Sequence, residues 1–574
     1  MFRNRCFKIF SVIALIVILV SSVGAHEALK SKTDSASAIP KYKNIIFMIP
    51  DGCSQSIQTL ARWYKGEDLT LDSMNCGMLR TDMANSVITG SGAAGTAFAT
   101  GHKTTVRFLG VGPRDDDLLS TFDDYDPKRA YAPMATILEL AKMMYKSTGL
   151  VATSRITHAT PAAFACHIFD RGLDNEIMEH MVYNNLTVAL GGGRRHLLPI
   201  YEGGKRTDAE NLEQVLIERG YEIVTTRDEL MSISPNRYTK LWGAFDMSHL
   251  APEMDREKYF PTQPSLAEMT EKAIDVLSQN PRGFFLMVEG SQVDWAGHNN
   301  DIGYMLNDFI EFDEAVKVAV EFAKNNGNTL VVAFADHNTG GMKIGHYYTS
   351  MGYTNTKVED LINPIKGMQI SANALVGEMG GDYSEANMIA KIKEFWGLDA
   401  TPDDIAEIND LAASVGMSYA LARVICKNHT VIGWTTHGHT GEDVPVWMYP
   451  QEKAIGAIDN TVLPLVSMCW QGVGPDALDH LTRKLYKDVE DAFPGNWELD
   501  NTDPENPVLV IKGKYRMPTS KDIINIPGLG SMQIGSLVVY APTRDIDGNV
   551  IEDRVFIPRT AVMIIRFCER FFEK

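Results

Sequence analysis

Short apolar runs that alternate with helical patterns restrict the fold of this 574-residue chain more than any other feature. The run Asn44–Pro50 is apolar at almost every position and ends in Asp51, which predicts a buried central strand followed by a loop. Similar runs occur at Gly149–Thr153, Thr187–Leu190, Phe284–Val288, Thr329–Ala335, Thr430–Trp434 and Val444–Tyr449. Helical patterns such as Tyr131–Ser147 and Asn307–Lys324 separate them. We therefore expect an α/β fold, a three-layer sandwich with a mostly parallel central sheet and helices on both faces.

The expected segments are a signal peptide (1–25), a flexible lead (26–42), a main domain (43–340 with 430–500), an inserted subdomain (341–429) and a β-rich C-terminal tail (501–574). Within the insertion, Ser384–Ala413 has the pattern of two successive helices. The second helix has a start signal, with Thr401 as N-cap, proline at the first position and acidic residues in the first turn.

The N-terminus has the pattern of a secretory signal. A basic region with Arg3, Arg5 and Lys8 precedes the apolar run Ile9–Val20, and small residues follow up to Ala25. A transmembrane anchor is the alternative, but about a dozen apolar residues are fewer than the roughly 20 that a spanning helix needs. We expect cleavage near Ala25, export to the periplasm or the extracellular space, and no membrane span afterwards.

Charge and cysteine content exclude two classes of protein. The net charge of −19 argues against nucleic-acid binding as the main function, because such proteins present basic faces. None of the 7 cysteines forms a CxxC pair, so the spacing excludes a zinc ribbon. Removal of the signal peptide takes Cys6 with it, and for the others both disulfides and buried free thiols remain open.

Carboxylate and imidazole side chains follow several of the expected strands. Asp51 comes directly after Asn44–Pro50, and Glu289 directly after Phe284–Val288. The others follow later strands or stand in the loop after Glu289: Asp294, His298, Asp336, His337 and His439. Each is a common turn or cap residue when taken alone. Because sites in α/β sheets form beyond the carboxyl ends of strands, the set together predicts a metal centre. His and Asp without thiolate suit catalytic zinc, and carboxylate and hydroxyl oxygens suit magnesium.

A run of small residues, Thr89–Gly101, surrounds Ser91. The pattern predicts a helix that begins just after Ser91, whose N-terminal N–H groups and dipole would face an incoming anion. Close packing of the helix explains the small residues equally well.

A third segment, Thr157–Ala165, contains His158 and Thr160 and precedes Arg171. Structurally it reads as a loop that leads into a helix, with Arg171 on the helix surface. Functionally, His158 and Thr160 could serve a hard metal ion. Arg171 could bind phosphate bidentately, which a lysine cannot do.

The chain resembles the bacterial-type alkaline phosphatases from about Lys43 to Pro475. The stretches that carry the resemblance, in their order along the chain, are NIIFMIPDG, SGAAGTAFATGHKT, THATPAAFACHIFDR, LGGGRRHLLP, VEGSQVDWAGHNND, ADHNTGGM and GHTGEDVPV.

This resemblance implies hydrolysis of small-molecule phosphate monoesters at a site with two zinc ions and one magnesium ion. It assigns the first zinc to Asp294, His298 and His439, the second to Asp51, Asp336 and His337 with Ser91 able to join, and magnesium to Asp51, Thr160 and Glu289 with His158 beside that site. Ser91 would attack phosphorus to form a phosphoserine, and Arg171 would bind the phosphate oxygens. The resemblance also implies a homodimer and a crown- or lid-like insertion.

The chain departs from the family pattern at three positions. Gly90 stands where the family commonly has an aspartate that orients the phosphate-binding arginine, which predicts a looser Arg171 and faster release of phosphate. His158 and Trp295 differ from the residues of some members, which leaves the third metal ion open.

Two other functions compete with this interpretation. A phosphodiesterase or sulfatase of the same superfamily is one, although Ser91 lacks the CxPxR or SxPxR context of sulfatases. An inactive exported protein that binds metal or phosphate is the other, and Gly90 is its only support.

Overall fold

The computed structural model describes residues 42–572 apart from 124–125, 452–453, 471 and 546. The predicted signal peptide and nearly all of the predicted lead lie outside the described residues. Among the described helices, none has the length and apolar character to cross a membrane.

A sheet of 10 strands forms the centre of the molecule, in the order β14-β2-β13-β8-β1-β7-β3-β4-β6-β5. Its strands are β1 (Asn44–Pro50), β2 (Asn75–Arg80), β3 (Ser147–Arg155), β4 (Val188–Gly192), β5 (Glu222–Val224), β6 (Leu241–Ala244), β7 (Phe284–Gly290), β8 (Thr329–Phe334), β13 (Val444–Tyr449) and β14 (Gly456–Asp459). β1 pairs in parallel with both β7 and β8, and all of its residues are buried. Only β13 runs antiparallel to its neighbours, so the predicted mostly parallel sheet is confirmed.

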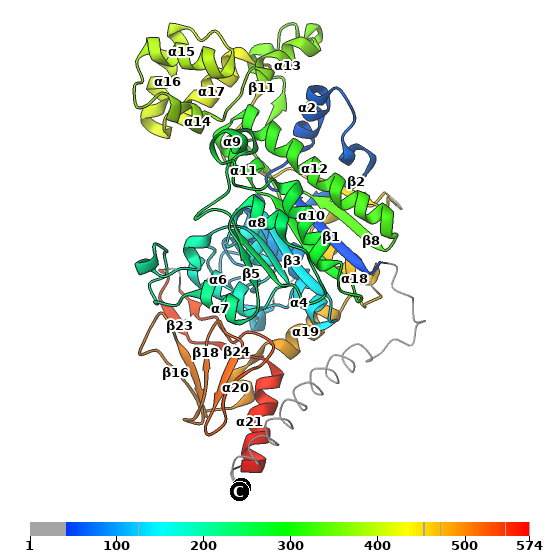
Figure 1. Cartoon of the computed structure of the whole chain (residues 1–574), viewed down its shortest axis with the longest axis vertical. Helices are drawn as coiled ribbons and strands as arrows, with labels where there is room; N and C mark the ends of the chain where they lie inside the picture. Colours follow the sequence, from blue (N-terminus) through cyan, green and yellow to red (C-terminus); the bar gives the residue numbers. More distant parts are fainter. Residues whose placement is uncertain (1–41, 124–125, 452–453, 471, 546, 573–574) are drawn as a thin grey trace.

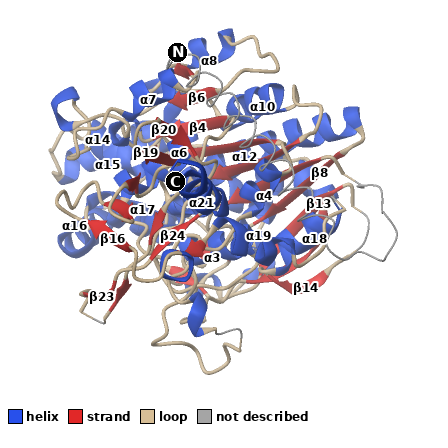
Figure 2. Cartoon of the chain, turned by 90° about the horizontal axis from the view of Figure 1, so that it is seen from below, coloured by secondary structure: helices blue, strands red, loops and turns tan. Residues whose placement is uncertain are grey.

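Helices cover both faces of this sheet. In one group, α10 and α12 pack against each other, α10 contacts β3 and α12 contacts β8. In a second group, α4 and α5 contact β3 and β7, and α3 packs against both of these helices. Figure 2 shows the strands side by side between helices. The helices of this α/β part are α2 (Gln55–Lys65), α3 (Ser91–Thr100), α4 (Ile137–Met143), α5 (Ala159–Ala163), α6 (Asp174–Tyr183), α7 (Leu212–Glu218), α8 (Arg227–Ser232), α9 (Glu253–Tyr259), α10 (Leu266–Leu277), α11 (Gln292–Asn299), α12 (Ile302–Asn326), α18 (Val462–Trp470) and α19 (Ala477–Leu485).

Five helices gather at one end of the molecule, at the top of Figure 1. They are α13 (Val358–Lys366), α14 (Ala372–Glu378), α15 (Glu385–Trp396), α16 (Pro402–Val415) and α17 (Met417–His429). The two helices predicted within Ser384–Ala413 are confirmed as α15 and α16. The predicted start signal is also confirmed, because the Thr401 hydroxyl accepts from the backbone N–H of Asp404.

The C-terminal module (487–572) lies at the opposite end and has a hydrophobic core of its own. Its elements are β15 (Lys487–Asp488), α20 (Val489–Ala492), β16 (Trp497–Asp500), β17 (Val508–Ile511), β18 (Tyr515–Pro518), β19 (Ile523–Ile526), β20 (Gly530–Gln533), β21 (Val539–Tyr540), β22 (Thr543–Arg544), β23 (Val550–Glu552), β24 (Val555–Ile557) and α21 (Arg559–Phe572). Strands β16 to β20 form an antiparallel sheet, in agreement with the prediction that the C-terminal segment is rich in β-strands. The expectation lacked α21, which buries Ile565 and Cys568 in that core.

Two expected elements were wrong in extent or place. Thr430–Trp434 is not a strand of the central sheet: β11 (Ile432–Gly433) pairs instead with β10 (Lys343–Ile344) in a separate two-stranded sheet. Ile432 is fully buried but its neighbours are half-exposed, so the run lacks the continuous burial of a central strand. The helix expected from Tyr131 begins only at Ile137, where Thr136 caps it. Among the residues that the structure describes, Cys53, Cys76, Cys166 and Cys426 are buried free thiols, and Cys568 is buried as well.

Candidate metal centre and active site

Three carboxylates meet where adjacent parallel strands end. Asp51 follows β1, Glu289 lies in β7 and Asp336 follows β8, and none of the three is exposed. Because β7, β1 and β8 are neighbours and run in parallel, their carboxyl ends lie at one edge of the sheet. The strand order thus brings together residues that are far apart in the sequence.

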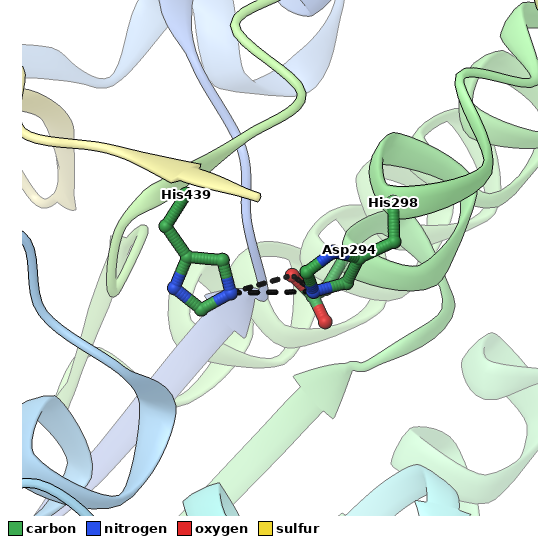
Figure 3. Close-up of side chains that lie close together, drawn as sticks. All are labelled: Asp294, His298 and His439. Carbon is green, nitrogen blue, oxygen red and sulfur yellow. Dashed lines mark hydrogen bonds and ion pairs between the residues drawn. The ribbon is translucent and has the colours of Figure 1, made fainter. Parts of the chain in front are cut away.

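The group formed by Asp294, His298 and His439 is drawn in Figure 3. Asp294 and His298 lie on α11 rather than in the expected loop, and one helical turn places the His298 Nε2 3.5 Å from the Asp294 Oδ1. The Nε2 of His439 lies 3.6 Å from the same oxygen and 3.3 Å from the His298 Nε2. The three ligand atoms could hold one metal ion.

His439 reaches this group through a short strand pair rather than through the expected central strand. It belongs to β12 (His439–Thr440), which pairs antiparallel with β9 (Asn338–Thr339), so that His439 faces Thr339. β9 directly follows His337. The imidazole rings of His337 and His439 consequently stack, with centroids 3.6 Å apart.

His337 connects this group to the carboxylates at the sheet edge. Its Nε2 lies 3.1 Å from the Asp336 Oδ2 and 3.5 Å from the Asp51 Oδ1. The backbone N–H of Gly52 donates to the other oxygen of Asp336 at 3.0 Å, which orients that carboxylate. Asp51, Asp294 and His337 form a second set whose ligand atoms lie within 4.8 Å of one another.

A third set contains Asp51, His158 and Glu289. His158 is the N-cap of α5, and Thr160 follows in the first turn of the helix with its side chain fully buried. Ser291, a residue that the sequence did not indicate, donates from its hydroxyl to Glu289 at 2.6 Å. The predicted neighbours of the third metal ion therefore lie together.

Ser91 is the first residue of α3 and lies beside these sets, with its Oγ 3.3 Å from the His337 Nε2. Gly90 is the N-cap, in extended conformation. The small residues that follow also serve packing, because a Cβ on Gly95 would come within 3.0 Å of the Ala163 Cβ on α5. Close packing and a site at the helix start are thus both present in this segment.

Arg171 points toward the same region from the chain after α5. Its guanidinium donates to the Nε2 of His158 at 2.8 Å, and its backbone N–H donates to the carbonyl of Arg107 at 2.9 Å. Burial lowers the pKa of Arg171, while the nearby carboxylates of Asp51 and Asp294 act to raise it. The guanidinium thus lies close enough to the carboxylates of the cluster to be stabilised by their negative charge.

The cluster concentrates negative charge in a buried place. Burial, and then the charges of Asp336, Asp294 and Glu289, raise the pKa of Asp51 well above its usual range. Burial likewise raises the pKa of Asp336 to about 7. Burial also lowers the pKa of His337 well below its usual range, which keeps the imidazole neutral and able to bind a metal ion.

Several buried polar atoms of the cluster have no hydrogen-bond partner. They are both carboxylate oxygens of Asp51, Oε1 of Glu289, Oδ2 of Asp336, Oγ1 of Thr160 and Nδ1 of His158. Buried polar atoms without partners are costly and rare in folded proteins. Divalent cations would satisfy these oxygens and neutralise the paired carboxylates, so the residues fit the metal ions that were expected.

Two orienting groups were not predicted. The Thr339 hydroxyl donates to Asp294, and the carbonyl of His437 is hydrogen-bonded to the Nδ1 of His298. Such groups set the orientation and tautomer of ligand side chains. The only sequence signal for Thr339 was its place two residues after His337, whereas a backbone carbonyl leaves no signal at all.

The molecule has a mostly parallel sheet, a buried cluster of histidines and carboxylates at its edge, and a serine at a helix N-terminus beside that cluster. These features define a class, the α/β-sandwich hydrolases whose active sites can bind metal ions. The model of the alkaline phosphatase family matches residues 42–470. The chain therefore belongs to the alkaline phosphatase family, and it is an enzyme, a phosphoric monoester hydrolase.

Individual relatives agree with this placement. The chain is 34% identical to alkaline phosphatase 4 of Bacillus subtilis over 485 residues, and the matched region spans 80% of this chain and 96% of the relative. The crystal structure of the cold-active alkaline phosphatase of a Shewanella species matches with a TM-score of 0.61 and 29% identity, over 74% of this chain and 98% of that one. The Thermus thermophilus enzyme matches with a TM-score of 0.64 and 26% identity, over 77% and 96%.

Proposed function

We propose that this enzyme hydrolyses phosphate monoesters through a phosphoserine formed on Ser91. The observation that carries the proposal is the position of the Ser91 hydroxyl, at the N-terminus of α3 and 3.3 Å from His337 of the metal-type cluster. A serine in this place lies beside side chains that would hold a metal ion able to lower the pKa of its hydroxyl. The backbone N–H groups at the start of the helix are donors for the incoming anion.

Two zinc ions and one magnesium ion are the proposed cofactors. Asp294, His298 and His439 would hold the first zinc, Asp51, Asp336 and His337 the second, and Asp51, Thr160 and Glu289 the magnesium, with His158 beside it. The close approach of the ligand atoms in the first and third sets supports the assignment. When bound, such ions supply Lewis acidity: they lower the pKa of a hydroxyl or water and neutralise phosphate charge.

The protein's own groups then have defined tasks. The oxygen of Ser91 forms a bond to phosphorus as the bond to the leaving alcohol breaks, and the alcohol oxygen takes up one proton to balance the one that the Ser91 hydroxyl loses. Arg171 holds two of the phosphoryl oxygens through its paired N–H groups. The oxygen of a water molecule then forms a bond to phosphorus as the bond from phosphorus to the Ser91 oxygen breaks. This step releases inorganic phosphate, and a proton of that water goes to the Ser91 oxygen.

Replacement of the nucleophile is the direct test. Ser91→Ala should reduce kcat on p-nitrophenyl phosphate by three orders of magnitude or more, roughly the effect of removing other catalytic nucleophiles. Elemental analysis should find the metal content close to that of the wild type. Ser54→Ala, at the N-cap of α2, is a matched control that should keep its activity. Full activity of the Ser91 variant would show that another group is the nucleophile.

Substrate choice separates the competing functions. Activity on p-nitrophenyl phosphate should greatly exceed activity on bis-p-nitrophenyl phosphate and on p-nitrophenyl sulfate. A preference for the diester or the sulfate would instead support the phosphodiesterase or the sulfatase, and no turnover of any of the three would support a binding protein.

Mass spectrometry of acid-quenched enzyme should locate the phosphoryl group on Ser91.

We also infer export and a homodimer, the first from the N-terminal sequence and the second from the family resemblance. N-terminal sequencing of the mature enzyme and its mass in solution test these two inferences.

A further inference from the structure

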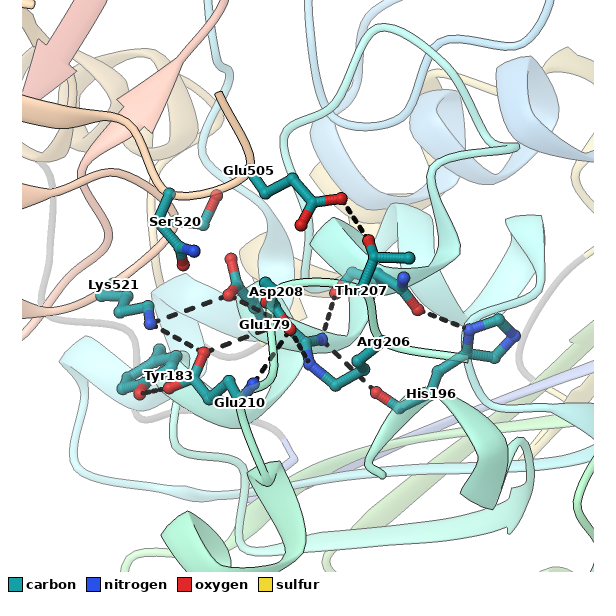
Figure 4. A network of polar contacts seen from close by, with 12 residues as sticks. Glu179, Tyr183, His196, Arg206, Thr207, Asp208, Glu210, Glu505, Ser520 and Lys521 are labelled. Atoms are coloured by element: carbon teal, nitrogen blue, oxygen red, sulfur yellow. Dashed lines mark hydrogen bonds and ion pairs between the residues drawn. The ribbon is translucent and has the colours of Figure 1, made fainter. Parts of the chain in front are cut away.

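The C-terminal module lies beyond residue 470, where the match to the family model ends. It packs Leu537 and Phe556 into the main hydrophobic core, and polar contacts attach it to the α/β part as well. The first contact is the polar network of Figure 4, in which Lys521 binds Glu210 at 2.7 Å. Although Glu179, Asp208 and Glu210 come close enough to resemble a metal site, Arg206 and Lys521 already pair with these carboxylates. The network is therefore an attachment of the module and not a metal site.

The second contact is made by Arg544 in β22. Its guanidinium lies over the ring of Phe169, 4.5 Å from the ring centroid. Its backbone carbonyl accepts from the Tyr131 hydroxyl at 3.4 Å. Nearby, Arg554 donates to the carbonyl of Ala130 at 2.8 Å. The module thus touches the α/β part just before Arg171.

Phe169 belongs to the arginine segment, residues 168–171, which pairs with the chain around Leu109. Leu109 and Ile168 exchange two backbone hydrogen bonds of 2.8 Å, and the N–H of Arg171 donates to Arg107. Phe169 packs only half-buried against a small cluster of Phe108, Val111, Ala130 and Tyr131. The guanidinium of Arg544 lies over one face of its ring.

We propose that Arg544 is a positioning residue for Arg171: through Phe169, the C-terminal module holds the arginine segment in the conformation that binds phosphate. The proposal rests on the phosphate-binding role of Arg171 proposed above. Phe169 stands two residues before Arg171, so a shift of the ring moves the backbone from which that side chain extends. Gly90 has no carboxylate that could orient Arg171. The orientation of the Arg171 side chain therefore depends more on the backbone of the arginine segment.

The test compares phosphate binding in variants of the full-length, metal-loaded enzyme. Arg544→Ala should raise both the inhibition constant of inorganic phosphate and KM about threefold to tenfold, the range expected for loss of a cation–π contact, with a smaller change in kcat. Arg544→Lys keeps a cation over the ring and should restore most of the affinity. Lys521→Ala, which loosens only the first attachment, should leave both constants at their wild-type values.

A double-variant experiment shows whether the effect passes through Arg171. In an Arg171→Ala background, Arg544→Ala should have no further effect on phosphate inhibition, whereas an undiminished effect would overturn the proposal. Unchanged inhibition in Arg544→Ala, with weaker inhibition in Arg171→Ala, would also overturn it and leave the proposed function standing. Unchanged inhibition in Arg171→Ala would instead refute the role of Arg171 itself. Phe169→Leu removes the ring from the other side, so it provides the same test if Arg544→Ala does not fold.

Discussion

The imidazole of His158 takes a role beside Arg171 that the sequence did not indicate. A guanidinium only donates hydrogen bonds, so the His158 Nε2 must accept from Arg171, and the proton of the neutral ring is then on Nδ1. A protonated nitrogen does not bind a metal ion. While this hydrogen bond lasts, neither nitrogen of His158 is free to bind a metal ion, although the ring lies beside Asp51 and Glu289 in the third set.

Gly90 offers a second change at the scale of one residue. Its backbone is extended, and a Cβ built on it meets no heavy atom within 4 Å, so a larger residue has room. Gly90→Asp should place a carboxylate near Arg171 and orient the guanidinium. We expect phosphate to inhibit about threefold to tenfold more tightly, as for a charge-assisted pair, and kcat to fall where product release limits turnover.

The inhibition constant of inorganic phosphate measures this effect. Gly90→Asn, with the same shape but no charge, should change it much less. Weaker inhibition in the aspartate variant than in the wild type would show that the missing carboxylate does not limit the grip on phosphate.

At the scale of elements, Asp404 joins the start of α16 to the end of α17. Its carboxylate accepts from the backbone N–H of Thr401 at 2.7 Å, from Asn428 at 2.7 Å and from the His429 Nε2 at 2.8 Å. Burial acts to raise the pKa of Asp404, but these hydrogen bonds outweigh it and lower the pKa to about 2. An acid at a helix N-terminus also interacts favourably with the helix dipole.

This depressed pKa predicts how the stability of the helical end depends on pH. A carboxylate with a folded pKa below its unfolded value stabilises the folded state above the unfolded pKa, and this contribution is lost as pH falls from about 4 to about 2. Asp404→Asn should therefore cost ~2 kcal/mol at neutral pH and progressively less below pH 4. Hydrogen exchange of α16 and α17 at several pH values measures this.

Asp403→Asn is the matched control, because Asp403 lies in the same helical turn but is exposed. It should cost far less, with little dependence on pH. Equal protection of α17 in the Asp404 variant and the wild type at neutral pH would contradict the assignment.

At the scale of the whole molecule, the buried carboxylate cluster ties stability to metal content. Without cations, the charges of Asp51, Asp294 and Asp336 oppose one another inside the protein. A ligand that binds only the folded state adds ~2.7 kcal/mol at a hundredfold excess over its Kd. Chelation should hence lower Tm by several degrees, and zinc with magnesium should restore it.

Calorimetry of chelated and reloaded enzyme, with metal content measured in parallel, checks this prediction. Ser91→Ala should show the same loss of Tm on chelation, because the cluster and not the nucleophile is responsible. An unchanged Tm after complete removal of the metal ions would contradict it.

The sequence by itself determined the buried parallel core, the positions of the ligand types and the start of α3. These features have local causes: a continuous apolar run such as β1 must be buried on both faces, and an acidic residue directly after it must lie at the sheet edge. The order of the family motifs then assigned each ligand type to an expected site.

Only the tertiary structure decided which of these residues meet, and how. The pairing of β12 with β9 delivers His439, α11 rather than a loop aligns Asp294 with His298, and Arg544 reaches Phe169 from a separate module. Such contacts join segments that are distant in the sequence, and no local propensity or spacing records them. Their geometry follows from strand order and packing, which the whole chain determines together.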